Sequence, residues 1–184
     1  MPKAFIDEQL KLDPRILKSQ HALHNALVHF YNQGYAFNAL SISMVTDKAK
    51  IARSTFYRHH TDLADIIVID FFSQIYTLQQ AFDKLPKINF ERTGELIIDS
   101  FLAHQIDFKL ALWAGIEGHI IDIFAGEFIK IVRLQQIQLE QTHFHAYFFA
   151  AALFNFGQLL ANDQTNISKN TAYRLYKQLI PKLN

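Results

Sequence analysis

Apolar positions in the first third of the chain follow helical spacing in three segments. The first segment begins at Pro14 and predicts a helix over about 14–33. Ser41 is a suitable N-cap for a second helix of little more than two turns. After a tight turn around Lys50, a third short helix is expected over roughly 52–59.

The rest of the chain has longer and more uniformly apolar segments. Asp62, with Asp65 three positions later, supplies a cap and an acidic first turn for a long helix that ends near Pro86. Its apolar residues fall on most faces, so we expect other helices to cover it on several sides. Further helices are predicted at about 93–111, 116–138, 141–161 and 168–182. The pattern therefore predicts an all-α protein.

Composition narrows the class of protein. Half of the 184 residues are apolar, which is enough to bury a core, and the six Gly and four Pro are too few for a many-stranded sandwich or barrel. The absence of Cys excludes disulfides, thiolate nucleophiles and cysteine-based zinc sites. The chain starts without the apolar stretch of a secretory signal, and its longest apolar run, 146–154, is far shorter than the roughly 18 residues of a membrane helix. We therefore expect a cytoplasmic protein that does not enter a membrane.

The charges are distributed unevenly along the chain. Residues 1–60 contain eight Lys/Arg and four Asp/Glu, a net charge of +4, so the other 124 residues carry −3 to give the overall +1. A basic N-terminal segment on a mildly acidic body favours a head that binds nucleic acid.

The stretch KIARSTFYRHH, residues 50–60, is the candidate for that binding. A helix, a tight turn and a second short helix form a helix-turn-helix, whose second helix enters the major groove of DNA. Val45 and Phe56 belong to the shared core. Arg and hydroxyl side chains suit base edges, whereas Tyr and His suit phosphates. The candidate DNA-binding residues are Ser41, Lys50, Arg53, Ser54, Thr55, Tyr57, Arg58 and His59.

These residues resemble a known family. LSISMVTDKAKIARSTFYRHHTDLADII, residues 40–67, is similar to the DNA-binding head of the TetR family of transcriptional regulators, with RSTFYRH at 53–59 as its recognition helix. RILKSQHALHNALVHFYNQGY, at 15–35, resembles the family's first helix. The resemblance implies a helix-turn-helix DNA-binding domain in 1–62, then a long connecting helix and a C-terminal helical bundle in 63–184 for dimerisation and possible effector binding. It implies a homodimeric repressor that binds double-stranded DNA at a pseudo-palindromic operator.

Four positions depart from the family's pattern. Thr46 stands where Ala is usual, and we expect its hydroxyl to bond the carbonyl of Ile42. Lys50 stands where Gly is frequent, and a left-handed Lys costs about 1–2 kcal/mol. Ala52 replaces a Ser or Asn cap, a loss of about 0.5–2 kcal/mol. Leu63 replaces a Lys that touches phosphate, so that contact should be missing. Together these changes predict a less stable head with weaker affinity for the DNA backbone.

The aromatic residues of the body have two interpretations, plain core and a cavity for a small apolar or aromatic effector. The candidate effector-pocket residues are Phe101, Phe108, Trp113, Phe124, Phe128 and Tyr147. A stripe with small residues on the helix 141–161 is either core or a dimer interface, and the resemblance favours the interface. Its residues are Tyr147, Ala150, Ala151, Phe154 and Gln158.

Other function classes have weaker support in the sequence. No Ser-His-Asp order, phosphate-binding Gly loop or carboxylate pair stands out, so we predict no enzymatic activity, no cofactor and no bound metal. Two alternatives remain for the histidines, a ligand shared by His21 and His24 and a zinc-sensing body. The residues of that zinc site would be His104, Glu117, His119 and Asp122. The alternative function is an interaction module that takes its signal from a protein partner.

Overall fold

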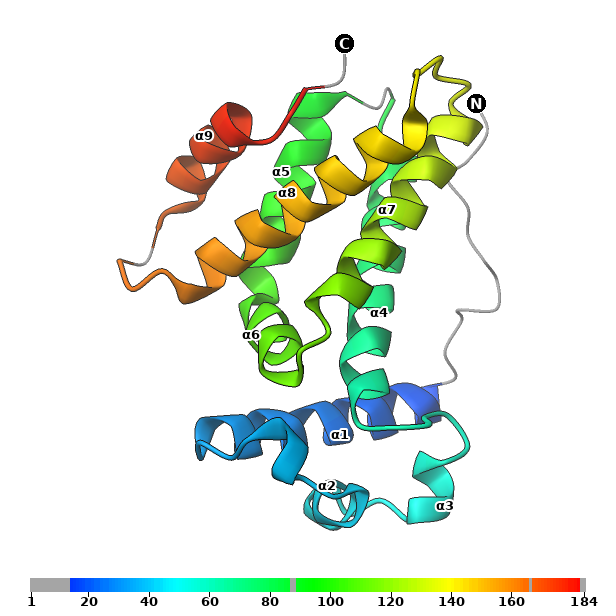
Figure 1. Cartoon of the computed structure of the whole chain (residues 1–184), viewed down its shortest axis with the longest axis vertical. Helices are drawn as coiled ribbons and strands as arrows, with labels where there is room; N and C mark the ends of the chain where they lie inside the picture. The colour runs from blue at the N-terminus through cyan, green and yellow to red at the C-terminus, as the bar shows by residue number, and fades with distance from the viewer. Residues whose placement is uncertain (1–13, 87–88, 166, 183–184) are drawn as a thin grey trace.

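The computed structural model describes residues 14–86, 89–165 and 167–182, and the regular secondary structure in these ranges is entirely helical (Figure 1). The helices are α1 (Pro14–Asn32), the 3₁₀ helix η2 (Phe37–Ala39), α2 (Ile42–Ala49), α3 (Arg53–Phe56), α4 (Ala64–Asp83), α5 (Phe90–Ala103), α6 (Gln105–Ala114), α7 (Glu117–Leu134), α8 (Thr142–Asn162) and α9 (Lys169–Leu179). The predicted all-α class is confirmed.

Helices α1 to α3 form a head at one end of the molecule, below the other helices in Figure 1. α2 packs against both α1 and α3. Leu23, Leu27, Val45 and Phe56 are at most 1% exposed, so the apolar spacing that predicted these helices marks their core-facing sides. The chain leaves α1 through Gly34, which has a left-handed φ of 77°.

The long helix α4 connects this head to the body and packs against α1, α5 and α6. The segment before its first turn is held by reciprocal bonds, because the Asp65 N–H donates to Asp62 Oδ1 (3.1 Å) and the Asp62 N–H donates to Asp65 Oδ2 (3.4 Å). The predicted acidic first turn at Asp65 is confirmed, whereas the N-cap position is Leu63 and not Asp62. The helix ends at Asp83, three residues before Pro86.

The body consists of α5 to α9, with α8 in contact with each of the other four. A methyl group on Gly157 of α8 would lie 2.3 Å from the ring of Phe108 on α6. The close approach of α6 and α8 therefore requires a glycine at this position.

The single helix predicted over 93–111 is wrong, because the chain forms α5 and α6 with a break at His104. His104 leaves helical geometry at φ −122° and ψ 32°, and its Nδ1 lies 2.8 Å from the carbonyl oxygen of Ser100. The predicted helix over 116–138 continues four residues too far, since α7 ends at Leu134.

Head and body share one continuous hydrophobic core. α6 packs against α1 and η2, and Trp113 at its end contacts the head directly. The Trp113 Nε1–H donates to the Tyr35 carbonyl (2.8 Å), and its ring meets Tyr31 and Phe37 edge-on. The head is thus seated on the body by packing, as well as by the chain connection through α4.

Candidate functional site

The turn between α2 and α3 is built as the sequence predicts. The Ser41 hydroxyl caps α2 by accepting from the Met44 N–H (3.2 Å), and Lys50 is left-handed at φ 56°. The Thr46 hydroxyl donates to the Ile42 carbonyl (2.9 Å), the bond expected for this departure from the family pattern. Ala52 has no side chain that caps α3, also as expected.

Helix α3 is shorter than the predicted 52–59. It spans Arg53–Phe56, and the next three residues form turns because the His59 N–H bonds back to the Phe56 carbonyl at i−3 spacing (3.0 Å). Phe56 is fully buried and stacks on His60, so these two side chains fix the end of α3 against the core. The candidate recognition helix is therefore one turn of α-helix followed by turn residues.

The candidate DNA-binding residues lie at the surface of this unit. Thr55 is half-buried, and the others are exposed. The guanidinium of Arg53 donates to Ser43 Oγ on α2, and Ser43 Oγ in turn donates to Asp47 Oδ2 (3.2 Å). Arg53 is thus held against α2 by one exposed hydrogen bond.

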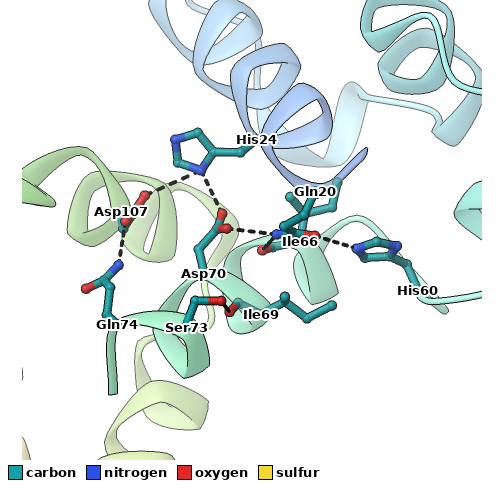
Figure 2. Close-up of polar contacts among 9 residues, drawn as sticks. All are labelled: Gln20, His24, His60, Ile66, Ile69, Asp70, Ser73, Gln74 and Asp107. Carbon is teal, nitrogen blue, oxygen red and sulfur yellow. Dashed lines mark hydrogen bonds and ion pairs between the residues drawn. The ribbon is translucent and has the colours of Figure 1, made fainter. Parts of the chain in front are cut away.

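A buried polar chain connects the end of α3 to α4 (Figure 2). The side-chain amide of Gln20 on α1 donates to the Ile66 carbonyl (2.7 Å) and to Asp70 Oδ1 (2.8 Å). Its oxygen faces His60 Nε2 at 2.9 Å. Burial is the largest influence on His60 and lowers its pKa, although the hydrogen bond to the Phe56 carbonyl opposes this. No role was predicted for His60, which is 5% exposed.

His24, Asp70 and Asp107 converge where α1, α4 and α6 meet, and we call these three residues the junction cluster. His24 Nδ1 lies 2.7 Å from Asp70 Oδ2 and 3.5 Å from Asp107 Oδ1. Burial raises the pKa of Asp107 to about 6. Burial also lowers the pKa of His24, but the hydrogen bond and charge of Asp70, with the charge of Asp107, outweigh this and raise it.

Sequence reasoning missed the junction cluster, because its members are 46 and 37 positions apart. One signal was present. Asp70 and Asp107 are single acids within strongly apolar segments, IIVIDFF and QIDFKLALW, and an acid placed among core residues needs a buried partner.

An apolar cavity of about 120 Å³ lies between α4, α5, α7 and α8. Phe101, Phe124 and Phe128 line it, together with Ile75, Leu78 and Phe82 among others. A second cavity of about 260 Å³ adjoins it and shares Phe82 and Phe128. The polar groups at the first cavity are Gln79 and Glu127, which hydrogen-bond to each other.

Three of the six candidate effector residues do not line these cavities. Phe108 is fully buried and packs against the Phe101 ring at 4.8 Å, so it belongs to the core. Trp113 lies at the contact with the head, and Tyr147 is exposed and hydrogen-bonded to Asp122.

The proposed dimer stripe on α8 also needs correction. Ala150 is fully buried and Phe154 is 1% exposed within the single chain, because both face α8's neighbours in the body, and neither is free to contact a partner. Tyr147 is exposed, while Ala151 and Gln158 are half-buried. The large exposed apolar residues of α8 are instead Phe144, Phe148 and Leu159, which are 62–72% exposed. Their spacing of 4 and 11 positions places them on one helical face.

The alternative histidine sites are not assembled. In the described residues, the junction cluster is the group of His and acidic side chains that converges closely enough to share an ion, and His104, Glu117, His119 and Asp122 form no such group. His21 is exposed and does not join His24 in the cluster.

By length and composition alone, α8 is a candidate membrane span among the described helices. Core helices of globular proteins pass the same test, and α8 packs against α5, α6, α7 and α9. This is weak evidence for a membrane protein.

Comparison with known proteins defines the fold. No protein-family model and no curated protein matches the chain. The crystal structure of Lin0861 from Listeria innocua is similar to this chain with a TM-score of 0.85 and 23% sequence identity, covering 96% of this chain and 95% of that one. A likeness at this identity shows a common fold from head to body.

Proposed function

We propose that the protein is a cytoplasmic, homodimeric transcriptional regulator of the TetR family that represses genes by binding double-stranded DNA. The observation that supports this best is the unit α2–turn–α3. Val45 and Phe56 are fully buried beneath it, while its Arg, Lys, Tyr and hydroxyl side chains stay at the surface. This is the division that a helix-turn-helix needs, with its core on one side and its base-reading residues on the other.

In this proposal, α3 lies in the major groove. Arg53, Ser54 and Thr55 contact base edges, where Arg is suited to the O6 and N7 atoms of guanine. Tyr57 and His59 contact phosphates and set the register. Two heads of a dimer then bind half-sites separated by about one turn of DNA, roughly 34–36 Å, or somewhat more.

The body supplies the place for an effector. Leu78 and Phe82 of α4 line the apolar cavity, and the same helix contacts α1 at its other end. A ligand that prefers one position of α4 therefore shifts the separation of the two heads. The cavity walls favour a small apolar or aromatic molecule, and the first cavity alone is below the roughly 300–1,000 Å³ of typical ligand sites.

Enrichment of DNA from a random pool by the purified full-length protein tests this function. We expect an inverted repeat bound at nanomolar concentration and competed poorly by random DNA. A pool without any enriched sequence, in the presence of protein that is folded by circular dichroism, contradicts sequence-specific binding.

The alternative is a regulator or interaction module of the same fold that takes its signal from a protein partner. The exposed apolar face of α8 favours it, because Phe144 and Phe148 are 72% and 62% exposed and lie one turn apart. A protein that is monomeric, and that binds its DNA sequence only after a partner is added, supports this alternative over the homodimer.

A further inference from the structure

The two carboxylates of the junction cluster face the same nitrogen atom. A single proton on His24 Nδ1 can serve Asp70 Oδ2 at 2.7 Å, but Asp107 Oδ1 stays 3.5 Å away. Asp107 is 3% exposed, and its Oδ1 has no hydrogen-bond partner. A buried acceptor left in this state costs free energy, so the arrangement is incomplete without a further positive group.

The other oxygen of each carboxylate is held in place by a glutamine. Gln20 Nε2 donates to Asp70 Oδ1 (2.8 Å), and Gln74 Nε2 donates to Asp107 Oδ2. Figure 2 shows that the remaining oxygen of each carboxylate is turned toward the same ring nitrogen of His24. Carboxylates that bind metals are oriented in this way by hydrogen bonds to the oxygen that does not coordinate.

The charges of the cluster suit a divalent cation. Once a cation displaces the proton of His24, the two ionised carboxylates supply a charge of −2 in a largely buried place, which balances the charge of a divalent cation. One imidazole nitrogen with two carboxylate oxygens is a donor set for Zn²⁺ and similar transition metals, whereas Ca²⁺ and Mg²⁺ prefer oxygen ligands alone.

We propose that the junction cluster binds one divalent transition-metal cation, such as Zn²⁺, through His24 Nδ1 and one oxygen each of Asp70 and Asp107. The cation takes the place of the Nδ1 proton, which passes to solvent. In tetrahedral geometry, metal–ligand bonds of about 2.0–2.2 Å separate neighbouring ligand atoms by about 3.3–3.6 Å. The 3.5 Å from His24 Nδ1 to Asp107 Oδ1 already has this value, whereas the 2.7 Å to Asp70 Oδ2 has to widen by more than half an ångström. The side chains of His24 and Asp70 are 15% and 17% exposed, so the cluster is not closed off completely from solvent.

The proposed metal site lies between the head and the body. Its ligands come from α1 in the head, from the connecting helix α4, and from α6 in the body. A bound cation therefore connects head and body at the first turn of α6, whereas Trp113 connects them at its last turn. Control of DNA binding by the metal supply would follow only if the proposed function is correct. Binding of the cation does not depend on that function.

Calorimetric titration of the tag-free, chelator-treated full chain with ZnCl₂ tests the site. We expect one Zn²⁺ per chain with micromolar or tighter affinity. His24→Gln and Asp107→Asn each weaken binding by at least about 10-fold, the loss seen even for residues that only orient metal ligands. His21→Gln is the matched control, since His21 is exposed on the same helix one turn earlier, and it binds Zn²⁺ as the wild type does.

Equal binding by the wild type, His24→Gln and Asp107→Asn overturns the proposal, and so does a wild type that binds no Zn²⁺. A second measurement needs no variant. In the wild type, one equivalent of Zn²⁺ shifts the NMR ring signals of His24 and leaves those of His21 in place. A shift of other histidines without His24 also overturns the proposal. Neither experiment uses DNA, so failure here and failure of the proposed function are separate results.

Discussion

At the residue scale, Arg53 and Tyr57 have different predicted roles in DNA binding. We expect Arg53→Ala to lower the preference for operator over random DNA by about 5- to 150-fold, because the lost base contact is worth about 1–3 kcal/mol. Tyr57 is 59% exposed, and Tyr57→Phe removes the hydroxyl that we propose contacts phosphate, so operator and random DNA should lose affinity by the same factor. Fluorescence anisotropy with operator and with random DNA measures the affinity of each variant for both, relative to the wild type.

Arg92→Ala is the control for the charge lost at Arg53. Arg92 is an exposed arginine of α5 in the body, and its removal should change neither affinity. Equal losses on operator and random DNA for both head variants would contradict the division between base reading and phosphate contact.

His60 gives the head a predicted pH dependence. Its pKa is lowered in the folded protein, mainly by burial, while the charges of Asp65 and Asp70 act against this and that of His59 adds to it. Below the ordinary value of 6.5, the unfolded chain takes up a proton that folded His60 does not, so acid favours unfolding. In urea unfolding between about pH 8 and pH 5, the stability advantage of wild type over His60→Gln should shrink as pH falls.

The surroundings of His60 also allow the opposite pH dependence to be interpreted. Both ring nitrogens face oxygens, with the Gln20 side chain at 2.9 Å and the Phe56 carbonyl at 3.3 Å. An advantage of the wild type that grows in acid would show that these acceptors hold a proton on each nitrogen and outweigh burial.

The residues that sequence predicts best are those whose partners are close in the chain. Ser41 caps an N–H three positions later, and Thr46 bonds a carbonyl four positions earlier, so propensity and spacing are sufficient. His24 and Asp107 are 83 positions apart, and only the packing of α1 on α6 brings them together. The turn was therefore predictable and the junction cluster was not.

At the element scale, helices were predicted well where one apolar face or a capping residue defines them. The break between α5 and α6 has neither Gly nor Pro, and apolar residues continue through it. Phe101 and Phe108 lie on opposite sides of the break, yet their rings pack at 4.8 Å because the chain turns between them. Tertiary packing thus decides this boundary, and the local sequence carries no signal for it.

The packing of α6 on α8 leads to a prediction about two glycines. Gly157→Ala puts a methyl group 2.3 Å from the Phe108 ring in the core, and we expect a loss of about 1–3 kcal/mol in the free energy of unfolding. Gly126→Ala on the exposed face of α7 meets nothing within 4 Å and should stabilise by about 0.5–1 kcal/mol through helix propensity. Urea unfolding of both variants gives the two values. A neutral Gly157→Ala would mean that α6 and α8 separate easily.

At the scale of the whole molecule, the proposed homodimer requires exposed apolar surface on the body. The core of the single chain already uses Ala150 and Phe154, which leaves the opposite face of α8 for a partner. Phe144, Phe148 and Leu159 form that face, and large side chains exposed together in this way mark an interaction site. Sequence reasoning placed the dimer interface on α8, but two residues of its predicted stripe, Ala150 and Phe154, are covered by the chain itself.

This face yields a prediction that separates the homodimer from its alternative. Phe148→Asp places a charge at the centre of the exposed stripe, where a dimer would have to bury it without a partner, so the variant should be monomeric. Leu179→Asp on α9 is the control, because Leu179 is similarly exposed at 59% but lies outside the stripe, and it should remain dimeric. Light scattering after size-exclusion chromatography gives the masses. If the Phe148→Asp variant is dimeric, the dimer interface lies elsewhere. If the wild type is monomeric, the exposed face of α8 is available to bind a different protein.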